Sequence, residues 1–193
     1  MNHLKSFALT AVAAMALMAI AASSASATTL KGGEPERTLG SGDAIDFSIP
    51  GGGSTVFVDT ENEEIDKCTA STLRMKLSSG NTGSIEELDW TSCTFFPTQT
   101  VTLGKLEFVS TGGTNGEVKA DANIEVTINT LFFGSCIYGI TGGTKIGTLA
   151  GNPATFTANA LIEKFSGPAP CPSTGKWTGS YISTQPTHFH IEP

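Results

Sequence analysis

The chain has 193 residues, of which 18 are Asp or Glu and 11 are Lys or Arg, so its formal net charge is −7. Such an excess of acid repels phosphate backbones and anionic membrane surfaces, which argues against a nucleic-acid-binding role. The length suits a single domain that buries a sizeable core.

The first 27 residues have the three parts of a cleavable secretory signal. Lys5 supplies a positive charge, residues 7–21 are almost wholly apolar, and Ala25-Ser26-Ala27 forms a small-residue cleavage site. The apolar run is shorter than the roughly 20 residues of a bilayer-spanning helix, which disfavours the alternative of an uncleaved anchor. We therefore expect a signal-peptide helix over residues 1–27, a mature chain beginning at Thr28, and no stable membrane insertion after cleavage.

Four cysteines lie beyond this segment, and an even number in an exported protein predicts disulfides. They are Cys68, Cys93, Cys136 and Cys171. Of the three possible pairings we expect Cys68–Cys93 and Cys136–Cys171, because sequential pairing closes each half of the domain on itself. Zinc sites use closely spaced cysteine pairs, and none of these four has another cysteine nearby in the sequence.

Residues 28–42 are polar, rich in glycine and without a hydrophobic period, so we expect a flexible leader there. A single domain is expected over residues 43–193, and in it the dominant period is two. Apolar residues alternate with polar ones from Ile45 to Ile49, and the glycine-rich turn at 50–54 ends that strand. The turn lacks the Lys-Ser/Thr that follows a phosphate-binding loop.

The clearest strand pattern runs from Val118 to Asn129, where every second residue is apolar. A helix would scatter these side chains around its surface, so the pattern predicts a strand with one buried face. Upstream, the apolar phase slips at Gly104-Lys105, which predicts a β-bulge. Further strands are expected near residues 56–58, 73–77, 88–92, 101–108, 136–140, 145–149, 154–165, 176–183 and 189–191.

Roughly ten strands separated by glycine, proline and asparagine turns, without an amphipathic helix, predict an all-β domain. The expected architecture is a two-sheet antiparallel Greek-key sandwich or a related barrel. Trp90 and Trp177 each lie near a cysteine in the sequence, and we expect both to be core side chains packed on the disulfides.

Five segments near the cysteines form a recognisable set. They are Cys68-Thr-Ala-Ser71, Leu88-Asp-Trp-Thr-Ser-Cys93-Thr94, Cys136-Ile-Tyr-Gly139, Ile146-Gly-Thr-Leu-Ala-Gly151 and Cys171-Pro-Ser-Thr-Gly-Lys-Trp-Thr-Gly-Ser-Tyr181. Over residues 55–193 the chain resembles small exported, disulfide-containing β-proteins of high-GC Gram-positive (actinobacterial) bacteria. The resemblance implies a β-fold and export. It implies no activity and assigns no functional residue.

Two groups of residues are candidate metal ligands. The first is Asp59, Glu61 and Glu63: calcium binds several carboxylates on a turn, but the central glycine of an EF-hand loop is missing, and we interpret the stretch as a solvated hairpin tip. The second is His188 and His190, which would share one face of a strand but lack a third ligand. We interpret them as exposed strand-end residues, and we expect no metal and no cofactor.

The sequence holds no strong catalytic set. A serine hydrolase would have to use a histidine close to the C-terminus, and the chain has no G-x-S-x-G motif. A glycosidase needs a facing pair of carboxylates and aromatic platforms, and surface charge explains the acids equally well. The candidates for such a pair are Glu86, Glu87, Asp89, Glu107, Glu117 and Glu125.

These observations favour an exported, non-enzymatic module that acts at the cell surface or in the medium, binding or supporting a cell-wall or protein partner that the sequence does not name. One alternative is a secreted hydrolase with a carboxylate pair. Another is a small-ligand carrier, which would need an apolar cavity between the sheets. The apolar clusters Phe95-Phe96 and Leu131-Phe132-Phe133 would form a binding patch if they met on one surface.

Overall fold

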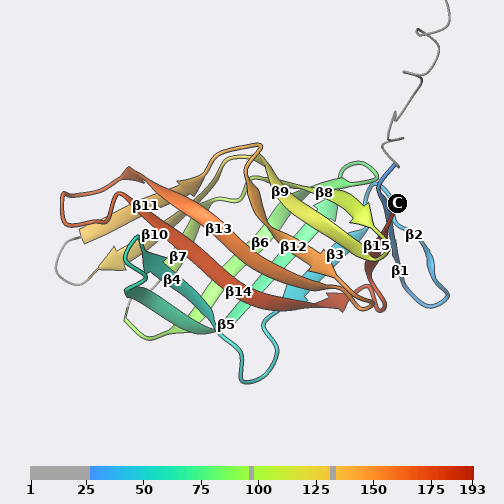
Figure 1. Ribbon diagram of the computed structural model, residues 1–193, viewed down its shortest axis with the longest axis horizontal. Coiled ribbons are helices and arrows are strands. Elements are labelled where there is room, and N and C mark those ends of the chain that lie inside the picture. The colour runs from blue at the N-terminus through green and yellow to red at the C-terminus, as the bar shows by residue number, and fades with distance from the viewer. Residues whose placement is uncertain (1–26, 96–97, 131–133) are drawn as a thin grey trace, which may run out of the picture.

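A computed structural model describes residues 27–95, 98–130 and 134–193, and every regular element in them is a strand (Figure 1). The signal-peptide prediction for residues 1–27 lies almost wholly outside this part of the chain. The described strands are β1 (Thr29–Gly32), β2 (Arg37–Thr38), β3 (Ala44–Ser48), β4 (Thr55–Asp59), β5 (Glu64–Leu77), β6 (Thr82–Cys93), β7 (Thr98–Thr102), β8 (Lys105–Gly112), β9 (Asn115–Ala122), β10 (Ile124–Thr130), β11 (Gly134–Ile140), β12 (Lys145–Ala150), β13 (Thr155–Ser166), β14 (Thr174–Gln185) and β15 (His190–Glu192).

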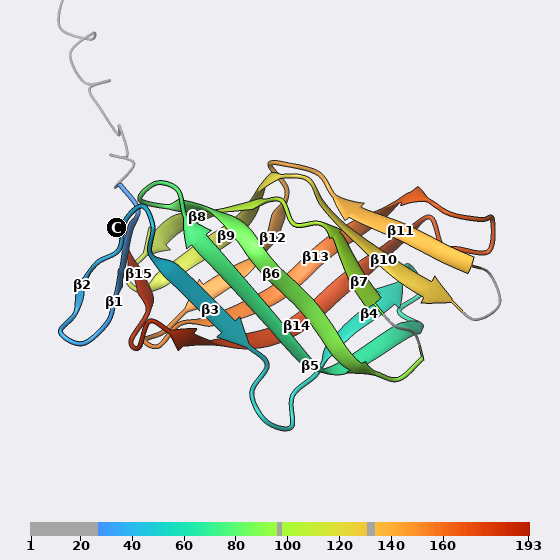
Figure 2. The same cartoon turned by 180° about the vertical axis from the view of Figure 1, so that it is seen from behind.

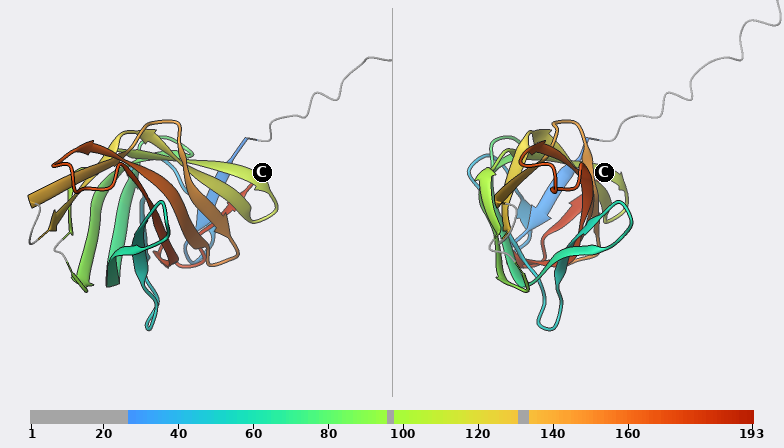
Figure 3. Two further views of the ribbon diagram at one scale, coloured as in Figure 1. Left: turned by 60° about the vertical axis from the view of Figure 1, so that its left-hand side comes forward. Right: turned by 90° about the vertical axis from the view of Figure 1, so that its left-hand side faces the viewer.

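Most of these strands form one antiparallel sheet that closes on itself. Strands β3 and β4 run in the same direction as one interrupted strand, and both pair with β5 on one side and β14 on the other. From β5 the pairing continues through β6, β8, β9, β12 and β13 back to β14, and β13 also pairs with β11, which is followed by β10 and β7. The result is a barrel, which Figure 3 shows from two further sides.

The expected all-β antiparallel fold is confirmed, in a closed form whose opposite walls pack together like the two sheets of a sandwich. When β3/β4, β7/β8, β9/β10 and β11/β12 are each counted as one interrupted strand, the strands follow the order of the chain around the barrel, and β14 closes it by pairing with both β3 and β4. Short connections explain this order, because a turn of a few residues joins a strand most readily to its antiparallel neighbour.

The pattern from Val118 to Asn129 has the predicted inward face but is divided into β9 and β10 at Asn123. The two halves pair with different strands, since β9 lies between β8 and β12, and β10 lies between β7 and β11. The phase slip predicted at Gly104-Lys105 is a break of the same kind. Gly104 separates β7 from β8 with a φ of 66°, and the pairing of β8 with β9 shifts register between Lys105 and Leu106.

A row of aromatic rings runs through the barrel interior. Successive centroids lie 5.4 to 6.2 Å apart, mostly with edges facing rings, an arrangement that adds to the free energy gained by burial alone. The row is Phe189, Phe47, Phe156, Trp177, Trp90 and Phe57. Both tryptophans are therefore core side chains, as predicted, and they contact each other in the middle of the row.

One end of the barrel, called here the closed end, is covered by a small sheet of β1, β2 and β15 (Figure 2). Leu30 on β1, Leu39 and Ile191 on β15 are all buried there. The flexible leader predicted for residues 28–42 is thus replaced by a packed segment. Local periodicity missed it because its partner, β15, lies at the other end of the sequence.

An ion pair ties this segment to the barrel wall. The two terminal guanidinium nitrogens of Arg37 donate to the carboxylate of Asp43, at 2.6 and 2.8 Å, and the Gly40 N–H donates to the same group at 2.8 Å. These contacts lower the pKa of Asp43 to about 2 from its ordinary value of 3.8. The hydrogen bonds from Arg37 have the largest effect, and the Gly40 N–H adds to it. Because that pKa is depressed, the pair stabilises the fold above about pH 4, and its contribution disappears as the pH falls through about 2.

The Asp43→Asn variant should therefore melt below the wild type at pH 6, and most of this difference should be lost at pH 2. Arg37 is well exposed, so solvent screening limits the expected difference to about 3 °C. Thermal unfolding of both proteins at the two pH values measures it. A difference that is equally large at pH 2 would contradict the assignment to this ion pair.

The opposite end, called here the disulfide end, carries both predicted bridges. Cys68 on β5 joins Cys93, its register partner on β6, and Cys136 on β11 joins Cys171 in the β13–β14 connection. The expected pairing is confirmed. Because the strands run up and down in chain order, the β4–β5, β6–β7, β10–β11 and β13–β14 connections all lie at this end.

Candidate functional site

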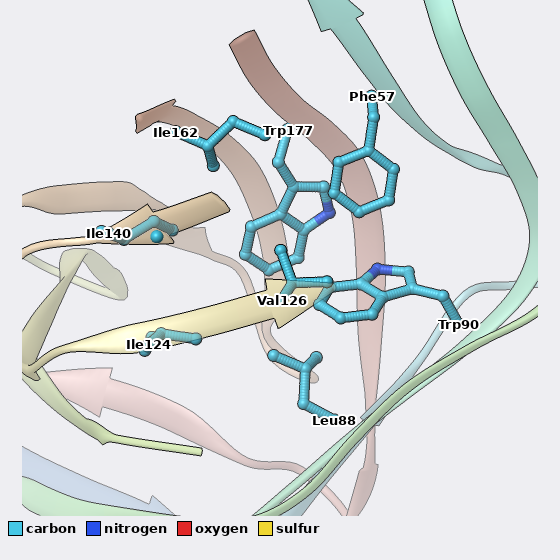
Figure 4. A pocket seen from close by; sticks show the side chains of 9 residues that line it. Phe57, Leu88, Trp90, Ile124, Val126, Ile140, Ile162 and Trp177 are labelled. Carbon is cyan, nitrogen blue, oxygen red and sulfur yellow. The ribbon is translucent and has the colours of Figure 1, made fainter. Parts of the chain in front are cut away.

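An apolar cavity lies in the barrel interior beside the tryptophan pair (Figure 4). Its volume is only about 10 Å³, roughly the space that one water molecule needs. Six strands contribute to its wall: β4, β6, β10, β11, β13 and β14. The lining residues are Phe57, Leu88, Trp90, Ile124, Val126, Gly139, Ile140, Ile162 and Trp177.

The strand alternation explains why these side chains meet. Ile124 and Val126 lie on the predicted inward face of the 118–129 pattern, and Leu88 and Trp90 are inward neighbours on β6. Gly139 is the exception, because a side chain at this position of β11 would point outward. A side chain there would collide with the ring of Phe165, which covers this part of the wall from outside.

Four polar side chains form a buried hydrogen-bonded group next to the cavity. The indole N–H of Trp177 donates to Thr55 Oγ1 at 2.7 Å, and Thr55 donates to the carbonyl of Thr178 at 2.9 Å. The Tyr181 hydroxyl donates to Ser71 Oγ at 3.1 Å. Burial raises the pKa of Tyr181, while the hydrogen bonds around its hydroxyl oppose that rise. We call Thr55, Ser71, Trp177 and Tyr181 the polar group.

Four buried side-chain polar atoms lack a hydrogen bond of good geometry among the described residues: Trp90 Nε1, Thr98 Oγ1, Tyr138 Oη and Ser183 Oγ. The Trp90 N–H, whose side chain is 5% exposed, is nonetheless within reach of the Tyr181 hydroxyl and helps to oppose the rise in its pKa. Tyr138 lies on β11 opposite Val126, one of the lining residues. Burial raises the pKa of Tyr138 to about 12, so this hydroxyl keeps its proton at neutral pH. A buried donor without a partner is costly unless something occupies it.

The acidic stretch forms the hairpin tip that the sequence predicts. Asp59 ends β4, and its Oδ1 accepts hydrogen bonds from the backbone N–H groups of Glu61 and Glu63, both at 2.9 Å. The carboxylate thus stabilises the turn itself. The side chains of Glu61 and Glu63 are exposed, and the described structure does not bring the three acids together as a ligand set.

The two histidines do not share a strand face. His188 lies in the turn before β15 with a φ of 56°, exposed, and its Nε2 is 2.9 Å from Glu34 Oε1. His190 begins β15 and is 4% exposed, so the prediction of an exposed side chain is wrong for it. Its Nδ1 is 2.8 Å from the carbonyl oxygen of His188, and Nε2 is 3.3 Å from Glu192 Oε1. The small sheet of β1, β2 and β15 covers this end of the barrel, and the local sequence could not reveal that cover.

One set of three potential metal ligands does come close together in the described residues: Asp66, Cys68 and Cys93, within 4.8 Å. The two sulfurs are bonded to each other, which leaves a single carboxylate as a donor. Asp66 is fully buried and accepts from the backbone N–H groups of Lys67 and Phe95 at 2.8 and 3.0 Å. Its position two residues before Cys68 was the available signal, since residues two apart share a strand face.

The carboxylates considered for a glycosidase pair lie on the outside of the barrel, exposed or half-buried, next to inward-facing neighbours. Glu87 forms an ion pair with Arg74 at 3.2 Å, and Glu117 pairs with Lys145 at 2.7 Å. Phe95 is 52% exposed. The rest of the proposed apolar patch, Phe96 and Leu131-Phe132-Phe133, lies outside the described residues.

Comparisons with models of protein families, with curated proteins and with solved structures each return no match. The part of the chain that the structure describes contains no helix with the length and hydropathy needed to cross a membrane. The two disulfides suit an oxidising environment. The inference of function therefore depends on the site itself.

Proposed function

We propose that this protein is exported and, without catalysing a reaction, binds a small apolar molecule inside its barrel. The observation that carries the proposal is the apolar cavity beside Trp90 and Trp177 in the barrel interior. Small-molecule sites are typically apolar hollows with a few polar groups that fix orientation. The polar group and the Trp90 N–H beside it provide such groups.

The export part of the proposal is supported by the signal-like residues 1–27 and by the two disulfides. The two disulfides hold together the half of the barrel that contains the cavity. Outside the cell, glutathione would not reduce them. The intact mass of protein collected outside the cell tests this part. It should correspond to a chain that begins at Thr28 and lacks four hydrogens relative to the fully reduced form.

The size of the cavity limits the ligand. An apolar cavity of about 150 Å³ is enough for benzene, and this cavity is far smaller. A ligand must therefore displace side chains of the wall, and the free energy of that displacement reduces its affinity. We expect a single small ring, such as benzene, to bind more weakly than in the micromolar range.

Titration of the wild type with benzene should give saturable, one-to-one binding, followed by calorimetry and by the fluorescence of Trp90 and Trp177. The Val126→Phe variant, which fills the cavity, should lower the affinity at least tenfold. Leu161→Phe is the matched control, because it enlarges an apolar side chain on the exposed face of β13. Circular dichroism verifies that each variant is folded.

An absence of saturable binding to the folded wild type would overturn the proposed function. Equal losses of affinity in Val126→Phe and Leu161→Phe would also do so, because they would place the ligand elsewhere than in the barrel.

A further inference from the structure

The two disulfides differ in how far a nucleophile can reach them. Three of the four cysteines are completely or almost completely buried, since Cys68, Cys136 and Cys171 are 0%, 3% and 3% exposed. Cys93, at the end of β6, is only partly buried against the core. In thiol–disulfide exchange a thiolate attacks one sulfur of the bridge directly, so access decides which bridge reacts. Exchange can therefore begin at Cys93.

The Cys68–Cys93 bridge joins two strands that are already paired. Cys68 and Cys93 are register partners on β5 and β6, and eight further register pairs follow along the same two strands as far as Leu77 and Gly83. The backbone hydrogen bonds of this ladder do not depend on the sulfurs. Opening of this bridge should therefore leave the β5–β6 pairing in place.

The Cys136–Cys171 bridge has no such support. Cys136 lies on β11, and Cys171 lies in the connection between β13 and β14, residues 167–173, which belongs to no strand. The connection packs closely on the buried bridge, because a Cβ added at Gly167 would lie 3.1 Å from Cys171 Sγ. This bridge is thus less accessible, and the local structure depends on it more.

Hydrogen bonds beyond Cys93 fix the chain on the far side of its bridge. The Thr94 N–H donates to the Lys67 carbonyl oxygen at 2.8 Å, and Thr94 Oγ1 donates to the same oxygen at 3.1 Å. The Phe95 N–H donates to Oδ1 of the buried Asp66 at 3.0 Å. The bridge therefore lies between the β5–β6 ladder and these contacts. Two thiols held in this way would remain adjacent after reduction, which favours closure of the same bridge.

We infer that Cys68–Cys93 is a reversible disulfide that exchanges with a dithiol, whereas Cys136–Cys171 is a structural cross-link. The inference goes beyond the proposed function, and neither depends on the other. A dithiol suits the site better than a monothiol such as glutathione, because its second sulfur completes the exchange within one mixed disulfide.

The exchange takes two steps. One thiolate of the dithiol attacks Cys93 Sγ, so that a mixed disulfide forms, the Cys68–Cys93 bond breaks, and the electron pair of that bond leaves on Cys68 Sγ, which takes up a proton. The second thiol of the dithiol then loses its proton and attacks the sulfur of the first. The electron pair of the mixed bond leaves on Cys93 Sγ, which is protonated in turn. The dithiol is oxidised to a disulfide by two electrons, and the protein is reduced by two.

The first test compares the two bridges within the folded wild type. The protein is kept in excess dithiothreitol without denaturant and sampled over time, free thiols are alkylated, and the modified cysteines are identified by mass spectrometry. Cys68–Cys93 should open at least about tenfold faster than Cys136–Cys171, while the circular dichroism remains that of the native protein. Oxidised glutathione, added after removal of the dithiol, should form the same bridge again.

The second test examines the point of attack with two variants that lose the same bridge. Cys68→Ala leaves Cys93 as the free thiol, and Cys93→Ala leaves Cys68, so each variant is the control for the other. Circular dichroism verifies that both are folded. With an aromatic disulfide reagent, the thiol of Cys93 should react at least about tenfold faster than the thiol of Cys68, because only Cys93 is partly exposed.

Equal opening rates of the two bridges would overturn the inference. Opening of Cys68–Cys93 only as fast as the whole protein unfolds would also overturn it, because the bridge would then be reached through the unfolded chain. A Cys68 thiol as reactive as that of Cys93 would contradict the assigned point of attack. These results leave the proposed function untouched, which the titration with benzene tests by itself.

Discussion

Replacement of Phe189 by alanine should lower the free energy of unfolding by about 3–5 kcal/mol, although the residue lies only four positions from Pro193. Its ring is completely buried at the closed end and meets the rings of Phe47 and Phe108 at 5.6 and 6.0 Å. Truncation would leave a cavity between the barrel and its covering sheet. The loss is measured by urea unfolding at neutral pH.

Phe95→Ala is the matched control for this prediction, because Phe95 is half exposed at the disulfide end. We expect it to change the stability by well under 1 kcal/mol, since surface substitutions usually do. A Phe189→Ala variant as stable as Phe95→Ala would show that the closed end is not packed as described.

Loss of the Cys136–Cys171 bridge, in a variant with both cysteines replaced by alanine, should cost about 3–4 kcal/mol in the chain-entropy model for a loop of 35 residues. The bridge joins β11 to the β13–β14 connection, so its removal also loosens the wall that carries Gly139 and Ile140. Urea unfolding of the oxidised wild type and the variant gives the difference.

Full reduction of the wild type provides an independent comparison. It should destabilise the protein by more than this variant does, because reduction opens Cys68–Cys93 as well. An oxidised variant as stable as the wild type would mean that the bridge adds nothing to the fold.

The two-residue period predicts the strands well because it reports which side chains face inward, a local property. It places Ile124, Val126, Leu88 and Trp90 correctly toward the core. Closure of the barrel could not be predicted in the same way, because it depends on β14 pairing with β3 and β4, far away in the sequence. The disulfide pairing was predictable, since sequential bridges join elements that are also neighbours in space.

The candidate site was predictable only in its parts. The sequence indicates that Trp90 and Trp177 are core residues, but the cavity arises where inward side chains of six strands meet, and no local pattern specifies that meeting point. The buried states of Asp66 and His190 were missed for related reasons. The burial of Asp66 follows from its sharing a strand face with Cys68. The burial of His190 depends on cover from β1 and β2, and the polar composition of residues 28–42 gives no sign of those strands.

The pairing of β1 with β15 brings Thr29 opposite Glu192, at the end of the barrel away from the disulfides (Figure 1). A fusion partner or surface linker attached beside Thr29 or Glu192 would therefore leave the disulfide end facing outward. The same adjacency makes the chain suited to circular permutation, with a short linker joining the two ends and new ends opened in an exposed hairpin such as Gly113-Thr114.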